Sequence, residues 1–185
     1  MNRIETHLQG VHVFETPKYK DTRGSFTVPF NLIEFREVTN FHADFIQDNL
    51  SRSKKGVLRG LHYQLNYPQG KLISVKKGRV IDFAVDIRMG SPTFGKSQSF
   101  IIDDVKHQSV YIPEGFAHGF YVESGEAVFS YKCTDSYYPE DEHGINWNDS
   151  DLKLSLSDKK PLVSEKDQLL PRLKDIDKDL LPVLN

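Results

Sequence analysis

The sequence predicts an all-β protein built as a jelly-roll barrel, with short peripheral helices and a C-terminal arm. Two observations carry this prediction. Short runs rich in Val, Ile, Phe and Tyr recur along the chain, separated by turn signals such as Lys77-Gly78 and Ser124-Gly125. No helical periodicity lies between these runs, and many short strands at regular spacing are typical of a sandwich or barrel.

The expected strands follow one another through most of the chain. They are residues 10–15, 25–30, 44–51, 56–63, 71–77, 79–87, 97–103, 109–112, 117–123 and 126–133. Segments 31–37 and 165–180 are expected to hold short helices, the second with Ser164 as N-cap and Asp167 at position N3. We interpret the chain, residues 1–185, as one domain, with a barrel core at about 25–147 and an arm at about 149–185 that lies over it.

Composition and charge narrow the classes of function. The chain has 185 residues, and its 24 basic and 26 acidic residues give a formal net charge of -2, which argues against a non-specific nucleic-acid binder. Its single cysteine, Cys133, permits no intramolecular disulfide and suits a reducing compartment. Because the chain shows neither a signal peptide nor an apolar run near the ~20 residues of a membrane helix, we expect a cytoplasmic protein with no membrane partner.

Two of the expected strands carry a polar face whose surroundings the pattern leaves open. In residues 80–87, Ile81, Phe83, Val85 and Ile87 form an apolar face opposite Val80, Asp82, Ala84 and Asp86. The plain interpretation is a core face and a solvent face, and the alternative is a cavity wall inside a barrel. The same choice, between an edge strand facing water and a cavity wall, applies to the uncharged polar row Gln47, Asn49, Ser51 and Ser53.

The segment VLRGLHYQ, residues 57–64, holds the first candidate for chemistry. Strict alternation places His62 and Arg59 on opposite faces, so both can reach one pocket only if the strand is bulged, and Gly60 is where a bulge is tolerated. A lone strand histidine is more often structural than catalytic. His62 is accompanied, however, by further candidates on other expected strands, which are Lys71, His118 and Tyr131.

A metal site is the first alternative to consider. Histidines on separate strands of a barrel suggest the metal-binding cupin arrangement, which wants a His-x-His pair and a nearby glutamate. Here the motif is His62-Tyr63-Gln64, so only His62 and His118 remain, whereas a divalent metal normally needs three or more protein ligands. We therefore expect no metal. The chain also has no nucleophile elbow, no phosphate-binding loop and no dinucleotide fingerprint.

Nine fragments occur in order over roughly residues 10–170: DTRG, FIQDNLSRS, VLRGLHYQ, PQGKL, VDIRMGSPTFG, IPEGFAHGF, YKCTD, GINWND and SEKD. Together they resemble the dTDP-4-dehydrorhamnose 3,5-epimerase family. The resemblance implies a cupin-like jelly roll, a homodimer, a dTDP-sugar as small-molecule substrate, and no metal or organic cofactor. Val28 departs from the pattern, because family members usually carry a nucleotide-binding glutamate there, and Ser136 stands where an aromatic residue is common.

The resemblance also implies a role for each matching residue. His62 corresponds to the catalytic base, Asp167 to the acidic group that orients it, Tyr131 to the proton donor on the opposite face of the sugar, and Lys71 to the lysine beside the C4 oxygen. Tyr137 corresponds to the tyrosine that packs on thymine. The positions that hold the nucleotide, the diphosphate or the sugar are Arg23, Gln47, Asp48, Asn49, Arg59, His118, Glu142 and Lys166.

The implied reaction is epimerisation of a dTDP-4-keto-6-deoxyhexose at C3, C5 or both, through an enolate, in deoxysugar biosynthesis. A C3-only epimerase or a 4-keto-sugar isomerase would share nearly all of these residues. Other hypotheses are a metal-dependent cupin enzyme, which Gln64 disfavours, and a non-catalytic sugar-nucleotide binding module. Lys71 and Tyr131 disfavour the binding module, because binding alone requires no acid and base on opposite faces of a sugar.

Overall fold

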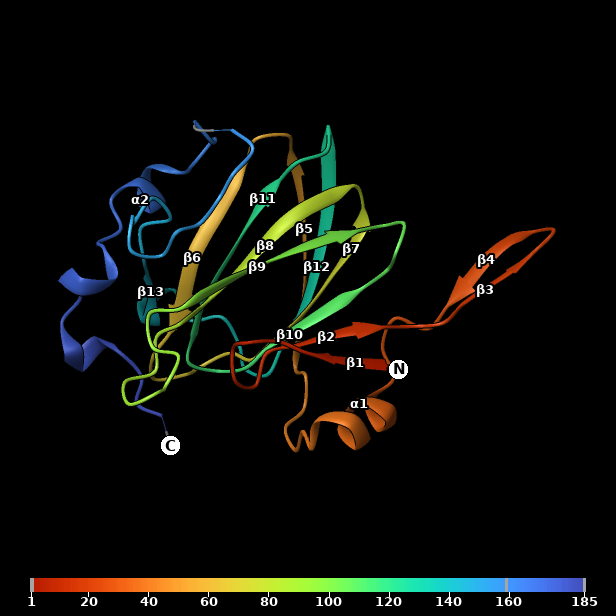
Figure 1. Ribbon diagram of the computed structural model, residues 1–185, viewed down its shortest axis with the longest axis horizontal. Coiled ribbons are helices and arrows are strands. Elements are labelled where there is room, and N and C mark those ends of the chain that lie inside the picture. Colours follow the sequence, from red (N-terminus) through yellow and green to blue (C-terminus); the bar gives the residue numbers. More distant parts are fainter. Residues whose placement is uncertain (1, 159, 185) are drawn as a thin grey trace.

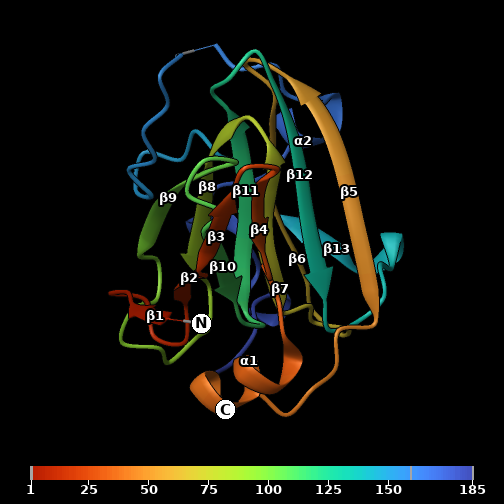
Figure 2. The ribbon, with the colours of Figure 1, turned by 90° about the vertical axis from the view of Figure 1, so that its right-hand side faces the viewer.

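Two antiparallel β-sheets face each other in the computed structural model, which describes residues 2–158 and 160–184 (Figures 1 and 2). The six-stranded sheet contains, in spatial order, β1 (Asn2–Glu5), β2 (His12–Glu15), β10 (Ser109–Ile112), β7 (Lys71–Lys77), β12 (Glu126–Cys133) and β5 (Gln47–Lys54). The five-stranded sheet contains β13 (Glu142–Gly144), β6 (Leu58–Gln64), β11 (Phe116–Val122), β8 (Arg79–Asp86) and β9 (Ser97–Asp103). This arrangement confirms the predicted all-β jelly roll.

The remaining elements lie outside these two sheets. They are the hairpin β3 (Lys18–Asp21) and β4 (Gly24–Thr27), the helices α1 (Leu32–Thr39) and α2 (Glu165–Gln168), and the 3-10 turns η1 (Pro139–Asp141), η2 (Leu173–Asp175) and η3 (Lys178–Leu180). Each expected strand is present, with ends that differ by at most three residues. The sequence missed β1, β3 and β13, because these short strands have no alternating apolar face and are defined by their backbone pairing.

Strand β8 corrects one prediction. Its apolar face was expected to point to the core and its polar face to solvent, yet Asp82 and Asp86 are fully buried. Val80 and Ala84 pack in the core between the two sheets, whereas Phe83 and Val85 pack in a second apolar cluster with residues of the C-terminal arm. Both faces are therefore covered, because the arm covers the apolar face from outside and the polar face points inward, between the two sheets.

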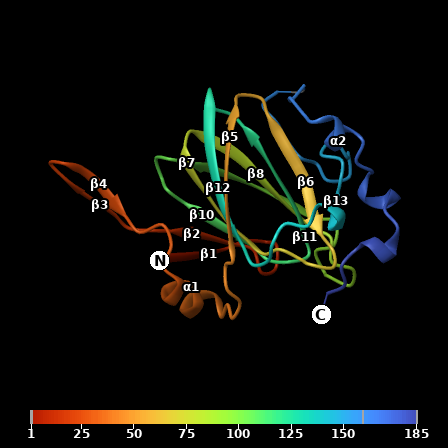
Figure 3. The ribbon, with the colours of Figure 1, turned by 180° about the vertical axis from the view of Figure 1, so that it is seen from behind.

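The C-terminal arm follows the outer face of the five-stranded sheet (Figures 1 and 3). Leu152, Leu173 and Leu181 bury their side chains there. The Tyr63 hydroxyl on β6 donates a hydrogen bond to the Leu180 carbonyl at 2.9 Å, which ties the end of the arm to the sheet. The arm also brings α2 beside β6. Within residues 2–158 and 160–184, no helix is long and apolar enough to span a membrane.

The hairpin β3–β4 extends away from the barrel, on the side opposite the arm (Figures 1 and 3). At its base, α1 begins at Asn31, whose side chain accepts hydrogen bonds from the backbone N–H groups of Ile33 and Glu34. Phe35 of α1 packs against Phe14 and Tyr111 of the six-stranded sheet. The base is thus anchored by an aromatic cluster, while the hairpin itself leaves Tyr19 and Phe26 exposed.

Candidate active site

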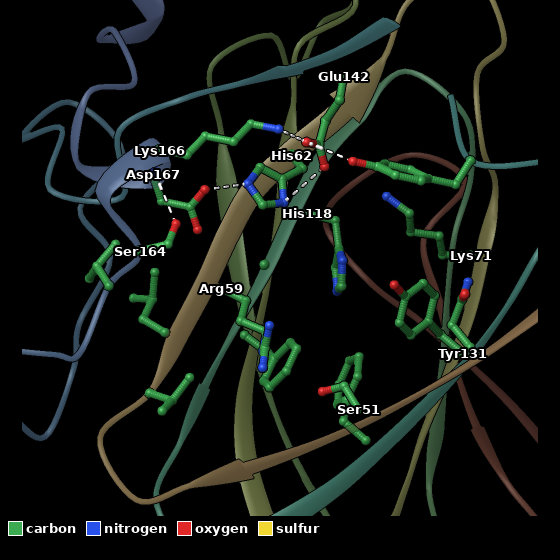
Figure 4. A pocket seen from close by; sticks show the side chains of 18 of the residues that line it. Ser51, Arg59, His62, Lys71, His118, Tyr131, Glu142, Ser164, Lys166 and Asp167 are labelled. Carbon is green, nitrogen blue, oxygen red and sulfur yellow. Dashed lines mark hydrogen bonds and ion pairs between the residues drawn. The ribbon is translucent and has the colours of Figure 1, made fainter. Parts of the chain in front are cut away.

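A cavity of about 700 Å³ lies between the sheets (Figure 4). Strands β5, β6, β7, β11 and β12 form its walls, and the segment around α2 closes one side. Of the residues that the sequence singled out, the structure brings together Gln47, Asn49, Arg59, His62, Lys71, His118, Tyr131, Tyr137, Glu142, Lys166 and Asp167. Ser51 also lines the cavity, so three of the four residues in the polar row on β5 form part of a cavity wall, although β5 is at the same time an edge strand.

A bulge in β6 lets Arg59 and His62 face the same cavity, as predicted. His118 of β11 pairs with His62 of β6, and Phe120 pairs with Arg59. Two steps along β11 therefore correspond to three steps along β6. The extra residue is accommodated at Gly60, whose φ of +107° lies in a region that favours glycine. A Cβ atom there would stand 2.6 Å from the His118 carbonyl oxygen, so only glycine fits this close approach of two strands.

His62 and Asp167 form a hydrogen-bonded pair at one wall of the cavity. The Nε2 atom of His62 lies 2.7 Å from Oδ1 of Asp167, whose other oxygen accepts the Gly60 N–H at 3.2 Å. The Ser164 hydroxyl caps α2 by accepting the Asp167 N–H at 3.1 Å, as the sequence predicted. Burial opposes ionisation of the Asp167 carboxyl, but hydrogen bonds from His62, Gly60 and Ser164 outweigh it and lower its pKa.

An ionised Asp167 can only accept, which decides the tautomer of His62. The ring must carry its proton on Nε2 to donate this hydrogen bond, so the lone pair of the neutral ring lies on Nδ1. Figure 4 shows His62 between Asp167 and Glu142, with Nδ1 on the Glu142 side. The nearer Glu142 oxygen is 3.6 Å from Nδ1.

Lys71 and Tyr131 stand across the cavity from His62 (Figure 4). Burial lowers the pKa of the Lys71 ammonium, and the negative fields of Cys133, Glu142 and Asp82 oppose that change. Burial also raises the pKa of the Tyr131 hydroxyl to about 12, so this group stays protonated near neutral pH. A protonated hydroxyl and a lysine amine therefore face the His62 imidazole across one space.

The sequence did not assign a role to Asp82, which lies under His118. Its Oδ2 atom is 2.8 Å from Nε2 of His118, and its side chain is fully buried. Burial raises the pKa of Asp82, while His118 and Lys71 act to lower it. The signal that could have found it was the polar face of residues 80–87, where the cavity-wall alternative placed a carboxylate inside the barrel.

Arg23 and Asp48 lie outside the cavity of the single chain. Arg23 is in the turn of the β3–β4 hairpin, where its guanidinium donates to the Asp21 carboxylate at 3.0 Å. Asp48 points to the outer face of β5 and pairs with Lys132 at 3.0 Å. Their expected contacts with a ligand stay predictions.

The cavity histidines are each held by a carboxylate of their own. His62 pairs with Asp167, and His118 pairs with Asp82. Across residues 2–158 and 160–184, no three His, Cys, Asp or Glu side chains are gathered so that they could hold a metal ion. The arrangement instead offers a base, an acid and cations around one ligand space.

Comparison with known proteins decides the family. The sequence model of dTDP-4-dehydrorhamnose 3,5-epimerase matches residues 5–175. The chain belongs to the dTDP-4-dehydrorhamnose 3,5-epimerase family. It is 46% identical over 168 residues to the dTDP-4-dehydrorhamnose 3,5-epimerase of Shigella flexneri, covering 90% of this chain and 93% of that one.

Members of the dTDP-4-dehydrorhamnose 3,5-epimerase family with solved structures share this fold. The Legionella pneumophila dTDP-6-deoxy-D-glucose-3,5-epimerase, in complex with dTDP-4-keto-L-rhamnose, superposes with a TM-score of 0.96 at 45% identity and covers 100% of this chain and 98% of its own. A dTDP-4-dehydrorhamnose 3-epimerase of Streptomyces niveus is 36% identical over 87% of this chain and 78% of its own. Relatives of this chain thus include both kinds of epimerase.

Proposed function

We propose that the protein is a cofactor-independent isomerase that epimerises a dTDP-4-keto-6-deoxyhexose at C3 and C5 through an enolate, in deoxysugar biosynthesis. The observation that carries this proposal is the placement of His62, backed by buried Asp167, across one cavity from Tyr131 and Lys71. Family membership and the dTDP-sugar bound to the Legionella relative support the substrate class.

Proton abstraction is the first step. The C4 ketone acidifies the hydrogens on C3 and C5, because the carbanion delocalises into an enolate. His62 has its lone pair on Nδ1, and Asp167 stabilises the imidazolium that forms when Nδ1 takes the proton. The C–H bond breaks, its electron pair moves toward O4, and the new N–H bond is on His62.

Lys71 and Tyr131 complete the inversion. The Lys71 ammonium offsets the charge that develops on O4, which is stabilisation where the transition state needs it. Tyr131, on the other side of the cavity, delivers its hydroxyl proton to the opposite face of the enolate carbon. Because its pKa is raised to about 12, the hydroxyl is present as an acid across the neutral pH range.

The rest of the cavity suits an anionic nucleotide. Arg59 and Lys166 provide cations for the diphosphate, and the half-exposed Tyr137 ring at the rim can pack on the base. The amide side chains of Gln47 and Asn49 offer hydrogen bonds to the same ligand. These groups would hold the nucleotide while the sugar reaches His62.

We also propose a homodimer, in the cytoplasm, whose reducing conditions suit the single Cys133. The β3–β4 hairpin exposes Tyr19 and Phe26 at 63% and 65%, and burying these rings against a second copy would be favourable. A dimer contact through this hairpin would place Arg23 at the cavity of the second copy, because Arg23 lies outside the cavity of its own chain. Sedimentation of the wild type and of a Tyr19→Ser, Phe26→Ser protein tests this, and a monomeric wild type would overturn it.

Deuterium incorporation tests the proposed function. The protein is incubated with dTDP-4-keto-6-deoxyglucose in heavy water, and NMR locates the label. We expect label at C3 and C5, its loss in His62→Ala, and its retention in the exposed control His42→Ala. A His62→Ala protein that exchanges at the wild-type rate would overturn the assignment. Label at C3 alone would support the second candidate, a C3-only epimerase, which is the activity named for the Streptomyces niveus relative.

A further inference from the structure

The two ring nitrogens of His62 face carboxylates with very different surroundings. On the Nε2 side, the Asp167 side chain is only 5% exposed, and its carboxylate also accepts the Gly60 N–H. On the Nδ1 side, Glu142 lies 3.6 Å away and is itself 12% exposed. Its other oxygen binds Lys166, whose side chain is 56% exposed. Of these two carboxylates, only Glu142 leads from the base toward solvent.

The proposed reaction creates a need for such a connection. Each abstraction leaves a proton on Nδ1 of His62, and the ring cannot act again as a base until that proton departs. If C3 and C5 are epimerised during one binding event, the proton must leave while the sugar fills the cavity. Direct contact of Nδ1 with bulk water is then blocked by the substrate itself.

We propose that Glu142 accepts this proton from His62 and passes it to solvent, so that the base is reset while the sugar stays bound. The inference rests on the proposed function and goes beyond it. In the first step the C–H bond breaks, its electron pair enters the enolate, and an Nδ1–H bond forms. In the second, that N–H bond breaks, an O–H bond forms on Oε1 of Glu142, and water at the rim removes the proton as hydronium.

The geometry around Glu142 suits proton transfer from His62. A movement of about 0.6 Å would bring Oε1 from 3.6 Å to hydrogen-bond distance of Nδ1. The other oxygen is held by Lys166 and, at 3.2 Å, by the Tyr137 hydroxyl. These contacts fix the position of that oxygen, while Oε1 faces Nδ1 of His62. The bond to Glu142 correspondingly raises the pKa of Lys166.

Other charged groups near the base do not offer this path. Arg59 is a cation and cannot accept a proton from imidazolium, and Lys71 stands across the cavity from His62. His118 is already engaged by the buried Asp82 at 2.8 Å. Asp167 stays paired with Nε2, on the far side of the ring from the proton to be removed.

Glu142→Gln tests the route, because the amide keeps the shape, and its oxygen can still accept from Lys166 and Tyr137, but it cannot take up the proton. The control is Glu140→Gln, which changes an exposed carboxylate outside the cavity. Rapid quench in heavy water measures the first exchange of substrate hydrogen, and a steady-state assay measures turnover. At saturating substrate, which removes any effect on binding, we expect the first exchange to fall far less than steady-state turnover, which should be lowered by roughly 100-fold with release of singly epimerised sugar.

Chemical rescue separates this role from substrate binding. Formate in solution is expected to restore much of the turnover of Glu142→Ala, which leaves room where the carboxylate was, while leaving the wild type and Glu140→Gln unchanged. If the first exchange falls together with turnover and no buffer restores it, or if turnover equals that of the wild type, the proposal is overturned. If Glu142→Gln fails to fold, the same measurements are made on Glu142→Asp, which retracts the carboxylate by one methylene. That variant must also lose far more steady-state turnover than first exchange. A wild type that incorporates no deuterium refutes the proposed function itself.

Discussion

Replacement of Asp167 by asparagine probes the pair on which the proposed base depends. The substitution keeps the size of the side chain and a carbonyl that can accept from Nε2 of His62, 2.7 Å away, but it removes the negative charge. It also leaves the Ser164 cap unchanged, because that bond is made by the backbone N–H of residue 167. The expected loss of transition-state stabilisation is therefore electrostatic.

The magnitude follows from the geometry. Taking about 4 Å between the centres of charge and an effective dielectric constant of about 20, the carboxylate stabilises the imidazolium by about 4 kcal/mol. The asparagine dipole recovers part of this, so the transition state should lose about 2 to 4 kcal/mol. At about 1.4 kcal/mol per factor of ten, kcat/KM should fall roughly 30- to 1000-fold.

The assay is deuterium incorporation into dTDP-4-keto-6-deoxyglucose under kcat/KM conditions. Glu165→Gln is the matched control, since it removes an exposed carboxylate from the same short helix without touching His62. Thermal unfolding of both variants checks that the arm stays in place. An Asp167→Asn protein with exchange within threefold of the wild type would refute the reasoning that its charge supports the base.

Three further predictions follow from the same structure. Tyr131→Phe should let solvent deuterium enter the sugar with retained configuration, because His62 still works from its own face; NMR that finds full inversion would contradict this. Gly60→Ala should destabilise the fold by about 3 kcal/mol or more, since φ is +107° and the new Cβ would meet the His118 carbonyl at 2.6 Å; unchanged urea denaturation would contradict it. Asp141→Asn should lower the free energy of unfolding at pH 7 by about 2 kcal/mol. Burial opposes ionisation of Asp141, but its bonds from the Asn66 and Tyr67 backbone lower its pKa below 3.8. Its contribution is therefore present above about pH 3.8 and is lost as pH falls through the lower folded-state value. Urea curves in which the difference does not shrink as pH falls below 3.8 would contradict this.

Much of the fold was readable from local pattern. Runs such as residues 71–77 and 126–133 have apolar alternation and turn residues at their ends, and they form the strands expected. Ser164 was readable as a cap because capping depends on neighbours within one turn. The short strand β13 was not readable, because its three residues become a strand only when β6 lies beside them.

The site shows the same division. The sequence alone indicated His62, and Gly60 as the point where a bulge would turn Arg59 toward it, since glycine tolerates the required backbone. The ordered fragments further identified the family. The local pattern of residues 80–87 did not reveal that the polar face is buried, because that depends on the arm that covers the opposite face and on the barrel that encloses Asp82.

Only the tertiary structure decided how the candidates act on one another. Asp167 is 105 residues from His62 in the chain, and their contact exists because the arm returns across the sheet. That contact places the proton of the neutral ring on Nε2 and its lone pair on Nδ1, and it leaves Glu142 as the carboxylate between the base and solvent. Sequence determined which groups are present, whereas long-range packing determined their distances, burial and charge surroundings, on which proton transfer depends.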